Sequence, residues 1–183
     1  IAELHALVFD PVSLVITAGS QDNGTPRQSS QNNLAWTDIT GGDGGSLAID
    51  TLVNPGFSVV YASSQNLGGL TRRTFNALNA QVGSASVLLN GGGALVPQFE
   101  TPIQANTVAG GRLVIAAGDA VYESFNQGDN VSIIGAGLQG SAIDYGGVSG
   151  GVTNANVLYV GVGSSVYLRT NGTGNLTVSP TAF

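Results

Sequence analysis

Two segments in the first quarter of the chain carry the residues best suited to chemistry. Asp22 and Asn23 lie between two apolar stretches, and Asp43 stands between two pairs of glycines in the run 41–45. Oxygen ligands of this kind suit Ca²⁺, and two carboxylates about 5 to 10 Å apart can hydrolyse a glycosidic bond. A hairpin turn is the alternative for the first segment, because Asn-Gly and Asp-Gly pairs supply positive φ. A flexible connector is the alternative for the second segment.

The composition excludes several kinds of site. There is no Cys among the 183 residues, so the chain has no disulfide, no thiolate metal site and no Cys nucleophile. The net charge of −6 argues against nucleic-acid binding, which needs clustered positive charge. No apolar run approaches the length of about 18 residues that a membrane span requires. With 42% hydrophobic and 9% charged residues, the chain is expected to fold.

The elements that must position these residues recur along the chain. Four short apolar runs have the composition of β-strands, and each is preceded by an Asp or Asn that favours a turn. The runs begin at Leu14, Val59, Leu113 and Val157, and the preceding turn residues are Asp10, Asp50, Asn106 and Asp144.

A third set of segments follows the apolar runs and contains Gln31, Asn76, Asn126 and Asn171, spaced by 45, 50 and 45 residues. Further strands are expected at 35–40, 87–90, 131–135 and 176–179. Four short strands in a repeat of about 45 residues are the pattern of a β-propeller blade. The sequence therefore predicts an all-β propeller domain or propeller fragment with antiparallel four-stranded blades, at approximately 1–45, 46–98, 99–139 and 140–183.

The third set of segments resembles the Asp-box turn of sialidase-like and sortilin-like propellers, Ser-x-Asp-x-Gly-x-Thr-Trp. The segment at 124–131 keeps Ser124 and Gly128, and the segment at 29–36 keeps Ser29 and Trp36, while Asn or Gln replaces the Asp of the motif. The residues 21–24, Trp36, Ile39 and 41–45 also resemble a blade of secreted xyloglucanase-like propellers. This resemblance implies degenerate Asp-boxes and an extracellular or cell-surface protein.

The number of blades leaves two arrangements open. Four blades can close into a small ring, or they can form part of a larger one. In a partial ring the first and last blades each expose an apolar face that needs a partner. That partner would be the rest of a larger polypeptide or another protein chain. The chain does not begin with Met, which indicates a mature or excised piece.

Three functions remain after these exclusions. We expect a non-catalytic secreted or surface module that acts as a binding or assembly platform, with Asp22, Asn23, Asp43 and Trp36 as candidate binding residues and a glycan as one candidate ligand. The first alternative is part of a carbohydrate-active enzyme of the xyloglucanase-like type, with Asp22 and Asp43 as its catalytic pair. The second is a structural subunit of a surface layer or filament. No cofactor is expected, and Ca²⁺ is the one metal that the acidic loop suggests.

Overall fold

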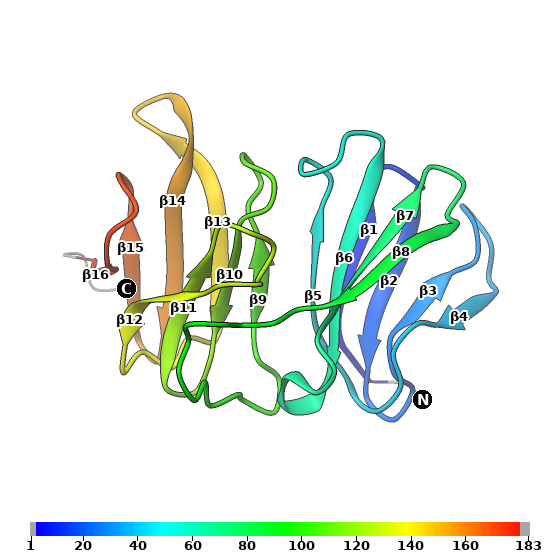
Figure 1. The fold of residues 1–183 in the computed structure, drawn as a ribbon, viewed down its shortest axis with the longest axis horizontal. Coiled ribbons are helices and arrows are strands. Elements are labelled where there is room, and N and C mark those ends of the chain that lie inside the picture. Colours follow the sequence, from blue (N-terminus) through cyan, green and yellow to red (C-terminus); the bar gives the residue numbers. More distant parts are fainter. Residues whose placement is uncertain (1–2, 180–183) are drawn as a thin grey trace. The chain divides into compact units, whose positions relative to one another are not determined.

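The computed structural model describes residues 3–179, and within them it is built from β-strands with one short 3₁₀ turn at Gln65–Leu67 (Figure 1). The strands form four antiparallel sheets of four strands, each in simple sequential order. This confirms the predicted all-β propeller architecture. We number the sheets as blades 1 to 4 in chain order.

The strands of blades 1 and 2 are β1 (Leu4–Asp10), β2 (Val15–Ser20), β3 (Pro26–Gln28) and β4 (Trp36–Asp38), then β5 (Gly44–Asp50), β6 (Phe57–Ser64), β7 (Thr71–Asn76) and β8 (Gln81–Ser86). Those of blades 3 and 4 are β9 (Ile103–Ala105), β10 (Leu113–Ala116), β11 (Ala120–Ser124) and β12 (Ser132–Ala136), then β13 (Ala142–Ser149), β14 (Val152–Val162), β15 (Ser165–Arg169) and β16 (Thr177–Val178).

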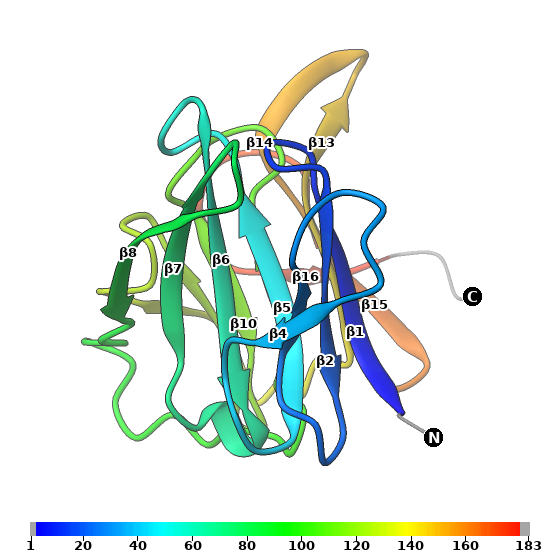
Figure 2. The same cartoon turned by 90° about the vertical axis from the view of Figure 1, so that its right-hand side faces the viewer.

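The chain divides into two compact units, each of which contains two blades. The first unit holds blades 1 and 2 together with residues 98–101. The second unit holds blades 3 and 4 together with residues 88–97. Within the first unit β5 packs against β1 and β2 (Figure 2), and within the second β13 packs against β9 and β10.

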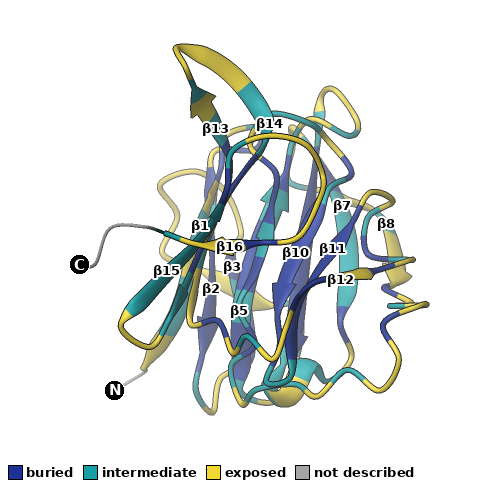
Figure 3. Cartoon of the chain, turned by 90° about the vertical axis from the view of Figure 1, so that its left-hand side faces the viewer, coloured by how far each residue is buried: buried dark blue, intermediate teal, exposed yellow. Residues whose placement is uncertain are grey.

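The second strand of each blade follows the predicted apolar run. In blade 3 every residue of β10 is buried (Figure 3), and in blade 2 β6 is buried at all but its two end residues. A strand whose two faces are both covered carries apolar side chains throughout, without the alternation of a half-exposed strand. The second unit has a core of Val114, Ala116, Val121 and Ile134 from blade 3 against Tyr145, Leu158, Val160 and Leu176 from blade 4.

Three of the four predicted turn residues end their first strand as expected. The side-chain Oδ1 atoms of Asp10, Asp50 and Asn106 each accept the backbone N–H two residues later, at 2.8–2.9 Å. These are Asx turns, in which the side chain replaces a backbone acceptor.

The expectation that Asp144 also ends a strand is wrong. Strand β13 continues to Ser149, and Asp144 pairs with Tyr159 in the middle of the ladder. The chain turns instead at Gly150 and Gly151, which both have positive φ and therefore form the tip of a longer hairpin.

The turns between the third and fourth strands also use Asn side chains. Asn76 Oδ1 accepts the backbone N–H groups of Leu78 and Ala80, both at 3.0 Å. Asn126 Oδ1 accepts the N–H of Asn130 at 2.8 Å in the equivalent turn of blade 3. A neutral amide oxygen thus supplies the acceptor that each of these two turns needs.

The fourth strand of blade 2 does not lie at 87–90, as the apolar run predicted. It is Gln81–Ser86, which pairs with β7, and residues 88–97 belong to the second unit. There Leu89 and Asn90 donate backbone hydrogen bonds to Gly128 and Asp129 at 3.0 Å. The apolar run is therefore a connecting segment, and the more polar sequence before it forms the strand.

Glycines allow blades 1 and 2 to approach closely at one end. A Cβ atom built on Gly44 would lie 1.9 Å from the carbonyl oxygen of Gly24, and one on Gly19 would lie 2.1 Å from that of Gly45. No side chain fits at these distances without backbone movement. Gly41, in the same glycine-rich run as Gly44, has nothing within 4 Å of its Cβ position.

We expect Gly44→Ala to lower the free energy of unfolding by about 1–3 kcal/mol, because the added methyl group overpacks the contact between blades 1 and 2. Gly41→Ala is the matched control and should change it by no more than about 0.5 kcal/mol. Urea unfolding followed by tryptophan fluorescence measures both values. Equal effects of the two substitutions would contradict the close approach.

Candidate functional site

The segment around Asp22 is a tight turn between β2 and β3. Ser20 N–H donates to the carbonyl of Gly24 at 2.9 Å, which closes the hairpin. Asp22 and Gly24 have φ values of 59° and 67°, so the backbone adopts the left-handed conformation that the residue types suggested. The side chains of Asp22 and Asn23 are exposed at the tip.

The structure brings the Asp43 loop against this turn. The backbone N–H of Asp22 donates to Asp43 Oδ1 at 2.8 Å, and the N–H of Asp43 donates to Gln65 Oε1 at 3.0 Å. The Asp43 carboxylate therefore ties the connector between blades 1 and 2 to the hairpin tip. Within residues 3–179 no group of three or more His, Cys, Asp or Glu residues is placed to hold a metal ion.

Trp36 lies elsewhere on blade 1. It pairs with Gln28 across β3 and β4, whereas the neighbouring pair Arg27 and Thr37 projects from the opposite face of the sheet. The guanidinium of Arg27 stacks on the ring of Phe75 in blade 2, 4.0 Å from its centroid, so the Arg27 face is the one that meets blade 2. Trp36 therefore belongs to the face that points away from blade 2.

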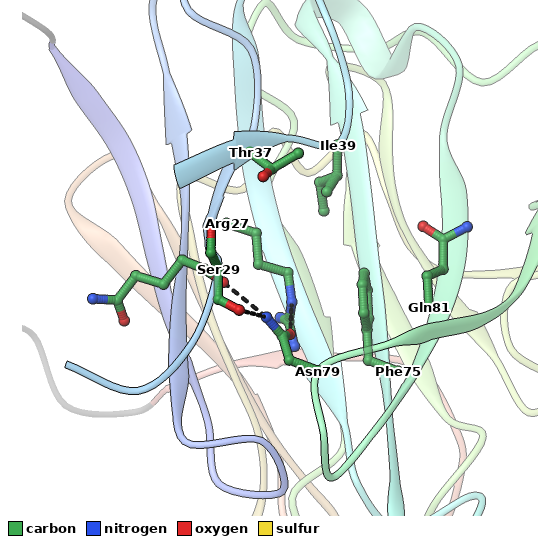
Figure 4. A pocket seen from close by; sticks show the side chains of 8 residues that line it. Arg27, Ser29, Thr37, Ile39, Phe75, Asn79 and Gln81 are labelled. Carbon is green, nitrogen blue, oxygen red and sulfur yellow. Dashed lines mark hydrogen bonds between the residues drawn. The ribbon is translucent and has the colours of Figure 1, made fainter. Parts of the chain in front are cut away.

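A groove of about 290 Å³ runs between β3 and β4 of blade 1 and β7 and β8 of blade 2 (Figure 4). Its floor is formed by Phe75 and Ile39, and its lining is completed by Arg27, Gln28, Ser29, Thr37, Asn79 and Gln81. Asn79 closes one end, where its amide donates to the carbonyls of Gln28 and Ser29 at 2.8 and 3.0 Å. Because Arg27 is paired with Asp10, the groove presents neutral polar groups above an apolar floor.

A buried ion pair lies beneath this groove. Arg27 Nη2 donates to Asp10 Oδ2 at 2.6 Å and to Ser13 Oγ at 3.0 Å, and its Nη1 donates to Thr17 Oγ1 at 2.8 Å. The hydroxyl of Ser58 in blade 2 donates to the same carboxylate oxygen of Asp10. Asp10 and Arg27 together thus connect three strands of blade 1 to the neighbouring blade.

The pKa of Asp10 reflects these contacts. Burial by itself would raise it, but the hydrogen bonds from Ser58, Arg27 and Ser13 and from the backbone at Val12 outweigh burial and hold the pKa below its usual value. The carboxylate is therefore a charged structural group, and no proton is available on it for acid catalysis near neutral pH.

The second unit contains a larger network of the same kind around Glu123 of β11. Arg169 of blade 4 binds this carboxylate through both terminal nitrogens, at 2.6 and 2.8 Å. Arg112 donates to it at 3.0 Å, and the Tyr145 hydroxyl also donates to it. Bidentate binding by arginine fixes both distance and orientation, so this network joins blades 3 and 4 in a defined register.

The sequence did not identify Glu123 or Arg169 as functional residues, and it identified Asp10 only as a turn residue. Glu123 and Arg169 are separated by 46 positions, and no local pattern links them. The signal that could have found them is their position: each lies inside or directly next to an apolar strand in a chain that has few charges. A charge at such a position is expected to be paired.

The far face of blade 1, which we define as the face pointing away from blade 2, exposes large apolar side chains. Leu7 and Phe9 project from it and are 59% and 53% exposed, and Trp36 is 43% exposed. The counterpart of Leu7 in blade 2 is Leu47, which also lies three residues before the Asx-turn residue. Leu47 faces blade 1 and is only 5% exposed.

The far face of blade 4, which points away from blade 3, is also accessible. Tyr159 lies on it and is 40% exposed. On the equivalent faces of blades 1 and 3 the side chains of Thr17 and Val114 are fully buried, because in each unit the next blade covers them. Around Tyr159 is a shallow groove of about 250 Å³ lined also by Ala142, Ile143, Asp144, Gly161 and Val166.

Comparisons with known proteins identify the fold. No protein-family model and no curated protein matches this chain. Two structures of the extracellular domain of BT4673 from B. thetaiotaomicron, a putative one-component and a putative hybrid two-component system, match 99% of the chain with TM-scores of 0.56 and 0.58 and identities of 11% and 12%. YCF48 from Cyanidioschyzon merolae matches 98% of this chain and 85% of its own, at a TM-score of 0.37 and 7% identity.

The chain spans 22% of the length of each BT4673 domain structure. At these identities the likeness concerns the fold alone. Among the described residues there is no helix with the length and apolar character needed to cross a membrane.

We expect Glu123→Gln to lower the free energy of unfolding by about 3–5 kcal/mol, because it leaves the buried Arg169 and the partly buried Arg112 without their counter-charge. The exposed residue Asp22 provides the control, and Asp22→Asn should have little effect. Chemical denaturation at neutral pH measures the difference between the two variants. A loss no larger than that of the control would show that the network adds no stability.

The same network predicts how stability depends on pH. Burial would raise the pKa of Glu123, but hydrogen bonds from Arg169, Tyr145 and Arg112 lower it below its usual value. A lowered pKa in the folded state gives stability that is complete above the unfolded value of about 4.3 and is lost as the pH falls through the folded value. The wild-type protein should therefore lose more stability than Glu123→Gln between about pH 5 and pH 2. Parallel pH profiles would contradict this assignment.

Proposed function

We propose that this chain is a non-catalytic β-propeller module that acts as a binding and assembly platform. The observation that carries the proposal is the far face of blade 1. Its Leu7, Phe9 and Trp36 are 59%, 53% and 43% exposed, although Leu47, the counterpart of Leu7, is buried by a neighbouring blade. Large apolar side chains exposed together on one face of a folded protein are typical of a protein-interaction site.

The arrangement of the carboxylates supports a role without catalysis. Asp10 and Glu123 are charged and engaged by arginines, so neither offers a proton or a reactive oxygen. Asp43 accepts a backbone hydrogen bond from the turn at Asp22 and serves to hold two loops together. Neither Asp22 nor Asp43 lines the groove of Figure 4.

We also infer that the module works outside the cell or at its surface, as part of a larger polypeptide. The two BT4673 structures that share its fold are described as extracellular domains, and this chain matches 22% of their length. The low charged fraction and the absence of cysteine agree with such a setting.

We further infer that the turns between third and fourth strands are derived from the Asp-box. In blades 2 and 3 the side chains of Asn76 and Asn126 accept backbone N–H groups across the turn. An aspartate at these positions would make the same hydrogen bonds with a charged acceptor. Replacement by asparagine keeps the turn and removes its charge.

A photo-crosslinking residue at position 9 tests the proposed binding surface. Phe9 and Phe125 are both 53% exposed, so benzoylphenylalanine at position 125 is a matched control on a different element. In cells that produce the protein, position 9 should give a defined adduct, identified by mass spectrometry, and position 125 should not. Equal labelling at both positions would contradict the proposal.

The enzyme alternative has its own test. Release of reducing sugar from a panel of plant and bacterial glycans should be the same for the wild-type protein and for the Asp22→Asn Asp43→Asn double variant. An activity that the wild-type protein has and the double variant lacks would establish a glycosidase and contradict a non-catalytic module.

A further inference from the structure

We propose that the partner of the far face of blade 4 is a second copy of this chain, which docks through the far face of its blade 1. The copies would therefore join head to tail. This inference rests on the proposed binding role and adds the identity of the partner and the direction of assembly.

The first argument comes from the blade contacts within each unit. In the first unit, the face of blade 1 that carries Thr17 and Arg27 meets the face of blade 2 that carries Leu47 and Phe75. In the second unit, the face of blade 3 that carries Val114 meets the face of blade 4 that carries Leu158 and Val160. In each contact the earlier blade contributes the face that carries Thr17 or Val114. The later blade contributes its opposite face.

The two far faces are the two halves of one such contact. The far face of blade 4 carries Tyr159, whose neighbours Leu158 and Val160 face blade 3. It is therefore the face that a following blade would cover, as blade 2 covers Thr17 and blade 4 covers Val114. The far face of blade 1 carries Leu7, the counterpart of Leu47, and is the kind of face that a preceding blade covers. Docking one onto the other continues an interface that the molecule already contains twice.

The shapes of the two surfaces also fit this pairing. On blade 4 the small residues Ala142 and Gly161 oppose each other across β13 and β14, and both line the 250 Å³ groove beside Tyr159. On blade 1 the side chains of Leu7 and Phe9 protrude from the sheet, as their exposure of 59% and 53% shows. A large apolar side chain can therefore enter the groove between small ones.

Because the two faces are unlike, a single contact of this kind does not have a two-fold axis through it. A heterologous contact generates a closed ring of copies or an open chain. Because each copy carries a net charge of −6, repulsion opposes association and salt should strengthen it. Asp144, the one charge in the groove, adds to this repulsion.

The absence of cysteine makes a direct test simple. Leu7→Cys and Tyr159→Cys are made as separate single variants with tags of different mass, mixed at high protein concentration in moderate salt, and treated with a short bismaleimide. Leu34→Cys, which is 93% exposed in the loop between β3 and β4, replaces Leu7→Cys in the control mixture.

The proposal predicts that the cross-linked product of Leu7→Cys with Tyr159→Cys exceeds the control product and both homodimers by about tenfold or more. A tenfold excess corresponds to a free-energy preference of about 1.4 kcal/mol for the unlike pair. Predominant homodimers of either variant would overturn it in favour of a symmetric contact. A mixed product no greater than the control product would overturn it as well.

A double variant, Leu7→Cys Tyr159→Cys, distinguishes a second copy from the chain's own blade. At high dilution the proposal predicts little cross-linking within one chain, whereas an efficient intramolecular product would overturn it. In either case the photo-crosslinking at position 9 still decides the broader binding role, because an adduct with a different protein would support the platform and refute self-assembly.

Discussion

A propeller blade is a thin sheet with two faces that both need to be covered. In this chain the requirement explains why the second strands are apolar almost throughout, as β6 and β10 show. It also explains why glycine occurs where blades 1 and 2 approach most closely, at Gly19 and Gly44. The same requirement leaves Leu7 and Tyr159 on faces that no neighbouring blade covers within their own units. The proposed binding role follows from these two faces.

The blade contacts combine apolar packing with a small number of buried charges. Asp10 in blade 1 is bound by Ser58 of blade 2, and Glu123 in blade 3 is bound by Arg169 of blade 4. Apolar packing alone permits several alignments of one blade on the next. The bidentate ion pair between Arg169 and Glu123 forms in only one of them. In a chain with 9% charged residues, these carboxylates serve the alignment of blades, and this agrees with a platform better than with an enzyme.

Features that depend on neighbouring residues could be predicted from the sequence. The second strands, the Asx turns at Asp10, Asp50 and Asn106 and the turns at Asn76 and Asn126 all arise within a few positions. The tight turn at Asp22 follows from the same local chemistry.

The features that escaped prediction depend on contacts between distant residues. The apolar run at 87–90 has strand composition, but its hydrogen-bond partners are at Gly128 and Asp129, so it forms a connector. The strand that contains Asp144 continues to Ser149, because the glycines that turn the chain lie at positions 150 and 151. The partners of Glu123 and the contact of Asp43 with the Asp22 turn required the fold.

Sedimentation equilibrium over a range of protein concentrations tests the central claim most directly. If the far faces of blades 1 and 4 join copies head to tail, the average mass should rise with concentration from that of one chain to that of two chains or more. The variant Leu7→Arg should keep the mass of a single chain. A wild-type protein that retains the mass of one chain at every concentration and salt strength would contradict the account.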